Sequence, residues 1–140
     1  YNANPTSMAA AIETLAQIPA VRKMAVLGVM AEIENPEMAY TDIARLARAN
    51  NIDIIAVGTS GYGTTSSTVD EAIEQLINCD SSSAILVKGS RVAALERVVD
   101  AVIPELGMRS WAGDQGRTTK PRTRQIVRQR TKPNGHLSHR

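Results

Sequence analysis

The chain has 140 residues, of which 43% are hydrophobic and 3% aromatic, with no Phe and a single Cys. This length suits one domain that packs helices on a sheet. So few aromatic rings argue against a surface that stacks nucleic-acid bases. A single Cys excludes a disulfide framework and a multi-cysteine metal site. The net charge of +2 is divided unevenly along the chain. Residues 1–106 carry 7 Lys/Arg and 13 Asp/Glu, whereas residues 107–140 carry 9 Lys/Arg and 1 Asp/Glu.

The expected elements alternate between helices and strands from the start of the chain. Asn4-Pro5 opens the first helix, since Asn is a favoured N-cap and Pro suits the first turn. Pro19 ends it, and the apolar run 24–28 is typical of a buried strand. The later elements are a helix from Asn35-Pro36 to Asn50-Asn51, a strand at 54–58, a Gly/Ser/Thr-rich loop at 59–67, a helix opened by a capping box at 68–71, a strand at 84–87 and a helix capped by Ser90.

This order predicts the fold class. Short apolar strands that each lead into a helix indicate βαβ units, and their right-handed crossovers give a parallel sheet with helices on both faces. We therefore predict an α/β fold, a three-layer Rossmann-like sandwich with a mostly parallel sheet. Ligands of such sheets bind beyond the carboxyl ends of the strands, here at 28–34, 58–67 and 88–91.

The basic tail is expected to behave differently from the body. Residues 107–140 contain few large apolar side chains and show no helical or strand period, so we predict a disordered tail after a domain at 1–106. Its charge predicts only non-specific, salt-sensitive binding of nucleic acid. His136 and His139 lie in it, and two His residues there are not expected to form a metal site.

Two segments carry candidate binding groups. Lys88, Ser90 and Arg91 follow a predicted strand, and their two cations and hydroxyl suit a carboxylate or phosphate. Asn2 and Asn4 precede a helix N-terminus, where their amides suit a nucleotide. Each set also has a simpler explanation. Ser90 could cap a helix while the two charges beside it are solvated. Asn2 could form a turn and Asn4 a helix cap, and for these two residues the spacing alone favours the simpler explanation.

Other candidate sites are weaker. The loop from Gly58 to Gly63 has the glycine spacing of a phosphate-binding loop, but Thr64 stands where the phosphate-binding Lys belongs, so we interpret it as a flexible loop. Residues 1–106 contain no His, which excludes a Ser-His-acid or Cys-His nucleophile. We therefore assign no catalytic residue and no metal ligand to this chain.

Three ordered blocks identify a resemblance: Tyr1-Asn2-Ala3-Asn4-Pro5, the segment 25–32 (AVLGVMAE) and the segment 86–91 (LVKGSR). Together they resemble the C-terminal domain of the Mur ligase family, over roughly residues 1–103. The sequence departs from the family at Val29, where an acid is common, and in a short stretch between Val57 and Val69.

The resemblance implies a function. It is greatest to members that use ATP and Mg to add D-alanyl-D-alanine to UDP-N-acetylmuramoyl-tripeptide in peptidoglycan synthesis. No apolar run approaches the ~20 residues that span a bilayer, so we expect a cytoplasmic protein with no membrane segment, and we expect a monomer. No phosphate-binding loop with its Lys is present, so this chain alone is expected to be inactive. The alternatives are a non-catalytic α/β module whose tail binds polyanions and a ligase like folylpolyglutamate synthase. The implied nucleotide contacts are Tyr1, Asn2 and Asn4, and the implied substrate contacts are Glu32, Lys88, Ser90 and Arg91.

Overall fold

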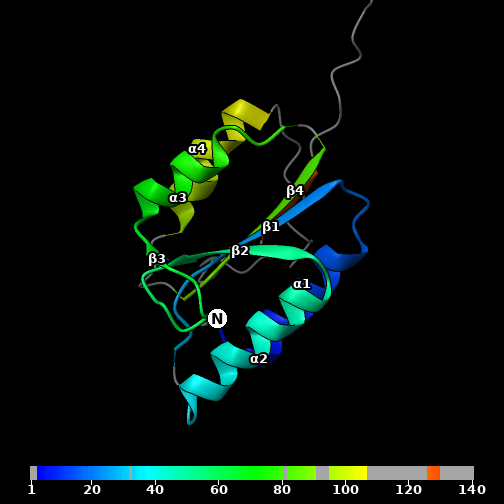
Figure 1. The fold of residues 1–140 in the computed structure, drawn as a ribbon. Coiled ribbons are helices and arrows are strands. Elements are labelled where there is room, and N and C mark those ends of the chain that lie inside the picture. The colour runs from blue at the N-terminus through cyan, green and yellow to red at the C-terminus, as the bar shows by residue number, and fades with distance from the viewer. Residues whose placement is uncertain (1–2, 32, 81, 91–94, 107–125, 130–140) are drawn as a thin grey trace, which may run out of the picture.

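The protein folds as a three-layer α/β sandwich (Figure 1). The computed structural model describes residues 3–31, 33–80, 82–90, 95–106 and 126–129. In chain order the elements are α1 (Pro5–Gln17), β1 (Arg22–Leu27), α2 (Pro36–Ala49), β2 (Ile52–Val57), β3 (Ser66–Ser67), α3 (Val69–Leu76), β4 (Ser83–Lys88), α4 (Glu96–Leu106) and β5 (Ile126–Gln129).

The sheet has the strand order β3-β2-β1-β4-β5. The first four of these strands pair in parallel, and β5 pairs antiparallel with β4. Helices α1 and α2 cover one face, and α3 and α4 cover the other (Figure 1). The predicted fold class, with its mostly parallel sheet, is confirmed.

Burial on both faces explains why the central strands are apolar along their whole length. Along β1, Ala25 and Leu27 pack into the core beneath α1 and α2, while Met24 and Val26 pack into the core beneath α3 and α4. The parallel pairing aligns β1 with β4 so that Leu27 lies opposite Lys88. The loops that follow these two strands therefore leave the sheet side by side.

The helix starts predicted from local sequence are confirmed. The Oδ1 atom of Asn4 accepts the Ser7 N–H at 2.9 Å, and Asn35 caps α2 in the same way. Thr68 and Glu71 form the expected capping box at the start of α3. At the end of α2, Asn51 has a φ of 54°, the left-handed conformation expected there.

One expectation about the last third of the chain is wrong, and a second does not hold at four residues. Helix α4 begins at Glu96, so Ser90 is not its N-cap. Residues Ile126–Gln129, within the segment expected to be disordered, form β5. The edge of β4 opposite β1 offers backbone groups that need partners, and Ile126 and Val127 are β-branched residues that favour strands. The rest of the tail lies outside the described residues.

The capping box of α3 supplies a stability prediction. Replacing Thr68 by Ala removes the hydroxyl that accepts the Glu71 N–H at 3.1 Å, and should lower the free energy of unfolding by about 1 kcal/mol. Urea denaturation would measure this loss. Thr65→Ala is the matched control, because Thr65 is exposed and lies before the helix. Equal losses in both variants would contradict the assignment of the cap.

Candidate functional site

The candidate site lies where β1 and β4 end. Gly28 donates its N–H to the Lys88 carbonyl at 2.9 Å, and Ser90 donates its N–H to the Val29 carbonyl at 2.9 Å. These bonds continue the pairing of the two strands past their ends and join the loop 28–31 to the segment 88–90. The site therefore forms at the carboxyl edge of the sheet, as the fold class predicts.

Lys88 and Ser90 are buried at this edge, with only 5% and 4% of their surface exposed. The Ser90 Oγ atom has no hydrogen-bond partner among the described residues. Lys88 likewise forms no ion pair within the described part of the chain. Burial lowers the pKa of the Lys88 ammonium, because leaving water disfavours the charged form.

Burying a charged side chain or a hydroxyl is costly when it has no partner. Both groups donate hydrogen bonds to an anion, and a carboxylate or phosphate would satisfy them together. Of the predicted substrate contacts, Lys88 and Ser90 are thus both buried at the end of β4, and their binding of an anion stays a prediction. Glu32 and Arg91, the other two, lie outside the described residues.

Gly89, between these two residues, packs directly against the β1 loop. A Cβ atom at position 89 would lie 2.9 Å from the Gly28 Cα and 2.7 Å from the Leu95 Cδ1. Real Cβ atoms do not approach backbone so closely. Glycine at this position therefore allows the Lys88 and Ser90 backbone to lie against the end of β1.

The start of α1 meets the same edge of the sheet. Ala31 donates its N–H to the Ala3 carbonyl at 3.2 Å, which ties the β1 loop to the residue before the Asn4 cap. Asn4 is exposed, and its Oδ1 is used by the cap. The simpler explanation of Asn4 as a cap is thus confirmed, and its nucleotide contact stays a prediction. Tyr1 and Asn2, the other predicted nucleotide contacts, lie outside the described residues.

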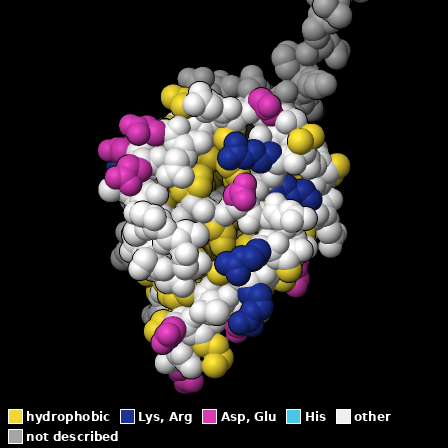
Figure 2. All heavy atoms as spheres, in the orientation of Figure 1, with side chains coloured by type: hydrophobic (Ala, Val, Ile, Leu, Met, Phe, Trp, Pro, Cys, Tyr) yellow, Lys and Arg dark blue, Asp and Glu magenta, His cyan; other side chains and the backbone are white. Residues whose placement is uncertain are grey.

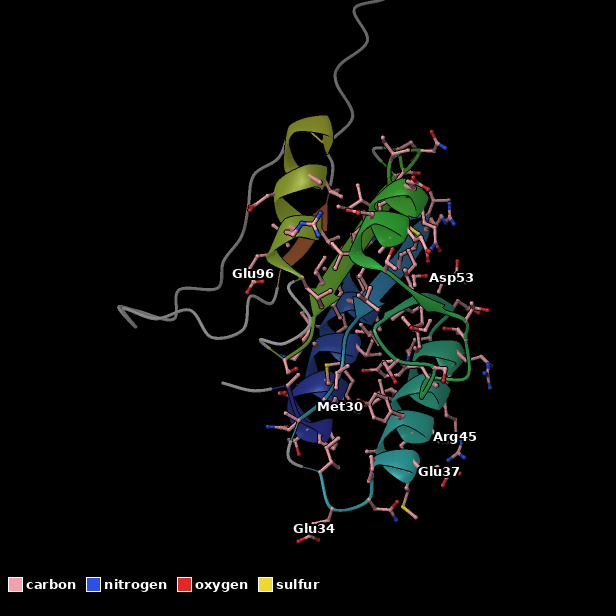
Figure 3. The ribbon with its side chains drawn as sticks, turned by 90° about the vertical axis from the view of Figure 1, so that its left-hand side faces the viewer. Met30, Glu34, Glu37, Arg45, Asp53 and Glu96 are labelled. Carbon is pink, nitrogen blue, oxygen red and sulfur yellow. The ribbon has the colours of Figure 1, made fainter. Side chains whose placement is uncertain are left out.

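Figure 3 shows how the β1 loop divides between buried and exposed side chains. Met30 is 5% exposed and lies among the helices, whereas Glu34 is exposed and points away from the body (Figure 3). The side chain of Val29, at the position where the resemblance leads one to expect an acid, is half-buried. The described part of this loop therefore contributes backbone groups rather than charges to the site.

Sequence reasoning missed two residues that hold this loop, Tyr40 and Tyr62. The loop from Gly58 to Gly63 was interpreted as flexible, yet Tyr62 within it is 1% exposed and donates its hydroxyl hydrogen to the Gly28 carbonyl at 2.7 Å. The available signal was a large aromatic residue within a run of Gly, Ser and Thr. No local pattern shows where such a side chain packs.

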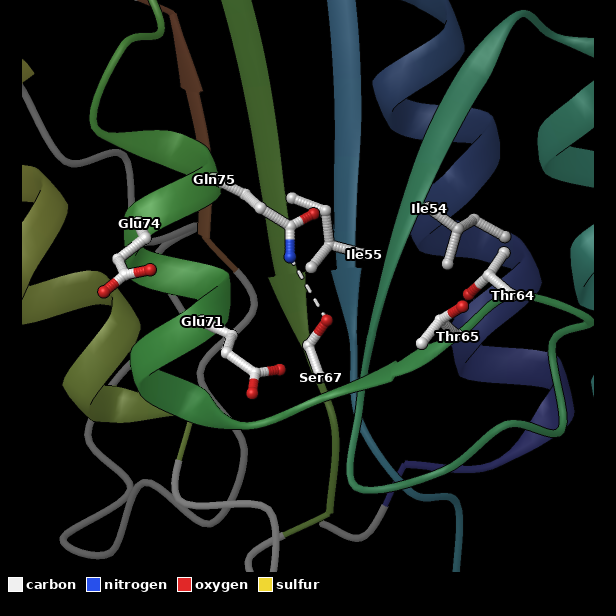
Figure 4. Close-up of a pocket in the computed structure, with 8 residues that line it drawn as sticks. All are labelled: Ile54, Ile55, Thr64, Thr65, Ser67, Glu71, Glu74 and Gln75. Atoms are coloured by element: carbon white, nitrogen blue, oxygen red, sulfur yellow. Dashed lines mark hydrogen bonds between the residues drawn. The ribbon is translucent and has the colours of Figure 1, made fainter.

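A separate groove of about 580 Å³ lies beside the β2 edge and α3 (Figure 4). Glu71 and Glu74 lie on its α3 side, and Gln75 donates a hydrogen bond to Ser67 within it at 3.1 Å. Two carboxylates and no cation suit neither a phosphate nor a carboxylate ligand. The other residues that line the groove are Ile54, Ile55, Thr64 and Thr65.

The surface charges of the body do not form a patch of one sign on the face seen in Figure 2, where acidic and basic side chains are interspersed. Three exposed Arg residues form ion pairs with Asp residues. Lys88 differs from these Arg residues because it is buried. The described residues contain no cluster of His, Cys, Asp and Glu that could hold a metal ion, and no helix among them could cross a membrane. The pairs are Arg22–Asp53, Arg45–Asp42 and Arg97–Asp70.

Comparisons with known proteins show which family and fold the chain shares. Residues 1–91 match the family described as "Mur ligase, glutamate ligase domain". The chain is 37% identical over 115 residues to the UDP-N-acetylmuramoyl-tripeptide–D-alanyl-D-alanine ligase of Escherichia coli K12, a match that covers 73% of this chain and 25% of that protein. The crystal structure of the MurF ligase from Thermotoga maritima in complex with ADP has a similar fold, with a TM-score of 0.59, 22% identity, and coverage of 76% of this chain and 27% of that one.

Proposed function

This chain belongs to the Mur ligase family, whose glutamate ligase domain it matches, and we propose that it is the C-terminal domain of the ligase that adds D-alanyl-D-alanine to UDP-N-acetylmuramoyl-tripeptide. The chain spans about a quarter of the length of the relatives it matches. The complete reaction therefore belongs to a longer protein, in which this domain closes over ATP and binds the incoming dipeptide. We expect that ligase to act as a monomer in the cytoplasm, in peptidoglycan synthesis.

The observation that carries this proposal is the buried pair of donors at the end of β4. The Lys88 ammonium pairs with the carboxylate of D-alanyl-D-alanine, and the Ser90 hydroxyl donates a hydrogen bond to the same group. The support is that both side chains are buried, that the Ser90 Oγ has no hydrogen-bond partner, and that Lys88 forms no ion pair within the described residues. Arg91, the next residue along the chain, is proposed as a third donor, and Glu32 as a contact to the dipeptide amine.

Holding the carboxylate fixes the direction of the amine at the other end of the dipeptide. In the complete ligase, ATP converts the tripeptide carboxyl into an acyl phosphate. The amine then attacks the acyl carbon, the new amide bond forms, and inorganic phosphate leaves with the electrons of the broken carbon–oxygen bond. The contribution of this domain is orientation, which makes the encounter effectively intramolecular.

ATP itself is proposed to meet this domain at Tyr1, Asn2 and Asn4. The support is that Asn4 is exposed at the start of α1, which the Ala3–Ala31 bond ties to the same edge as Lys88. The described residues do not assemble a set of carboxylates for Mg²⁺. We propose that the remainder of the complete ligase holds Mg²⁺ and the phosphate-binding loop.

The proposal makes a direct prediction for the isolated chain. It should release no phosphate from ATP, because a Lys-bearing phosphate-binding loop is missing and Thr64 occupies that position. In the complete ligase, phosphate release should require both UDP-N-acetylmuramoyl-tripeptide and D-alanyl-D-alanine. A coupled phosphate assay measures both. ATP turnover by the purified chain that survives repurification would contradict the first expectation, and ligation of L-glutamate in place of D-alanyl-D-alanine would favour the folylpolyglutamate-like alternative.

A further inference from the structure

The loop after β1 is held by two phenol groups that come from separate parts of the fold. Tyr62, in the loop between β2 and β3, donates its hydroxyl hydrogen to the Gly28 carbonyl at 2.7 Å. Tyr40, on α2, accepts the Met30 N–H at 2.8 Å and donates its own hydrogen to the Met30 carbonyl at 3.5 Å. The carbonyls on either side of Val29 are thus both bound by a tyrosine.

The two rings also support each other. Tyr40 and Tyr62 meet edge to face, with ring centroids 4.8 Å apart and an angle of 74° between the rings. Gly61 makes the approach possible, because a Cβ atom there would lie 2.7 Å from the Tyr40 Cγ. Burial, and secondarily the neighbouring Tyr40, raises the pKa of the Tyr62 hydroxyl, so this hydroxyl stays a donor over a wider pH range than an ordinary phenol.

The segment that the two tyrosines hold, residues 28–30, is also the segment that bonds to the backbone of the candidate site. Val29 accepts the Ser90 N–H, and Gly28 donates to the Lys88 carbonyl, both at 2.9 Å. A shift of the loop must therefore move the backbone that places the Lys88 ammonium and the Ser90 hydroxyl. We propose that Tyr40 and Tyr62 are positioning residues for D-alanyl-D-alanine binding, an inference that rests on the proposed function for the identity of the ligand.

The test uses the 140-residue chain labelled with ¹⁵N and the variants Tyr62→Phe and Tyr40→Phe, which keep the rings and remove the hydroxyls. Two quantities are measured: hydrogen exchange of the Ser90 amide without ligand, and the dissociation constant for D-alanyl-D-alanine by NMR titration. Losing one such hydrogen bond should accelerate exchange at Ser90 and raise the dissociation constant, each by about three- to tenfold. Amides in α1 that lie away from the loop should exchange as in the unmodified chain.

Thr59→Ala is the matched control in the same loop. It removes the bond from the Gly61 N–H to the Thr59 Oγ1 at 3.0 Å, which stays within the loop 58–67. This variant should leave Ser90 exchange and D-alanyl-D-alanine affinity unchanged. If it matches Tyr62→Phe, or if exchange accelerates uniformly over the chain, the phenols stabilise the fold in general and the positioning role is overturned.

The two proposals fail in different ways. If the unmodified chain does not bind D-alanyl-D-alanine while Ser90 exchange still responds selectively to Tyr62→Phe and Tyr40→Phe, the loop is positioned as proposed but the ligand is wrong. If D-alanyl-D-alanine binds with the same affinity to all variants and Ser90 exchange is unchanged, the ligand stands and the positioning role is overturned.

Discussion

Replacing Lys88 by Met should stabilise the folded chain and weaken its function at the same time. Met keeps most of the side-chain length and removes the charge of a residue that is 5% exposed and has no ion-pair partner among the described residues. Relief of that desolvation should raise the free energy of unfolding by about 1–3 kcal/mol. If Lys88 instead served packing, Lys88→Met would lower the free energy of unfolding.

The functional cost should be large in the complete ligase. A charged hydrogen bond to a carboxylate contributes about 1.5–3 kcal/mol, so the KM for D-alanyl-D-alanine should rise by about 10- to 150-fold. The KM values for ATP and UDP-N-acetylmuramoyl-tripeptide should change far less. Steady-state kinetics would measure the KM values, and urea denaturation of the same variant would measure the free energy of unfolding.

Lys23→Met is the matched control, on the neighbouring strand and at its opposite end. The Lys23 Nζ donates to the Ala16 carbonyl at 2.6 Å, near the end of α1, where a cation is favourable. Its removal should therefore lower the stability and leave the KM for D-alanyl-D-alanine unchanged. A loss of stability in Lys88→Met together with an unchanged KM would show that Lys88 serves the fold rather than the ligand.

The stability gain from Lys88→Met should also depend on pH. Burial lowers the pKa of Lys88 in the folded state below its ordinary value of 10.5. Between these two pKa values the unfolded chain binds more protons than the folded chain, so the stability contributed at this position rises with pH. The advantage of Lys88→Met should thus be full below the folded-state pKa of Lys88 and shrink as the pH rises from there toward 10.5. Urea denaturation of both proteins at several pH values would measure it.

The elements of the fold that sequence predicted are those encoded by neighbours in the chain. The caps at Asn4 and Thr68 act on an N–H three residues away, so local spacing is enough to find them. Strand β5 depends on the edge of β4, some forty residues earlier in the chain, and the short strand β3 depends on pairing with β2. Such pairings leave little local pattern beyond β-branched residues, and four or fewer residues are too short to show alternation.

The candidate site shows the same difference between local and long-range signals in the sequence. Lys88 and Ser90 were predicted because they directly follow a strand that reads as buried, and that position holds ligands in parallel sheets. Their burial, and the missing partner of the Ser90 hydroxyl, depend on packing against the loop after β1. Tyr62 reaches that loop from 34 residues away, a distance along the chain that no motif spans. The candidate residues could therefore be named from the sequence, whereas the contacts that hold them in place could not.

Replacing Gly89 by Ala should be the most damaging small change at this site. The new Cβ would lie 2.9 Å from the Gly28 Cα and 3.2 Å from the Gly28 nitrogen, and backbone cannot rotate away as the Leu95 side chain can. The end of β1 must then separate from the end of β4, which strains the bond from the Gly28 N–H to the Lys88 carbonyl. Overpacking of this kind costs about 1–3 kcal/mol, and the displaced donors should also lose D-alanyl-D-alanine binding.

Gly63→Ala separates this steric effect from the conformational cost of replacing glycine. Gly63 has a φ of +78° and open space around its Cα, so Ala there should cost about 1 kcal/mol through backbone strain alone and leave the site intact. Gly89 has no such φ, and its cost arises from contact. Urea denaturation and NMR titration with D-alanyl-D-alanine of both variants distinguish the two causes. Destabilisation by Gly89→Ala with unchanged affinity would mean that the contact between the strand ends serves packing, because the donors would then keep their places when the strand ends move apart.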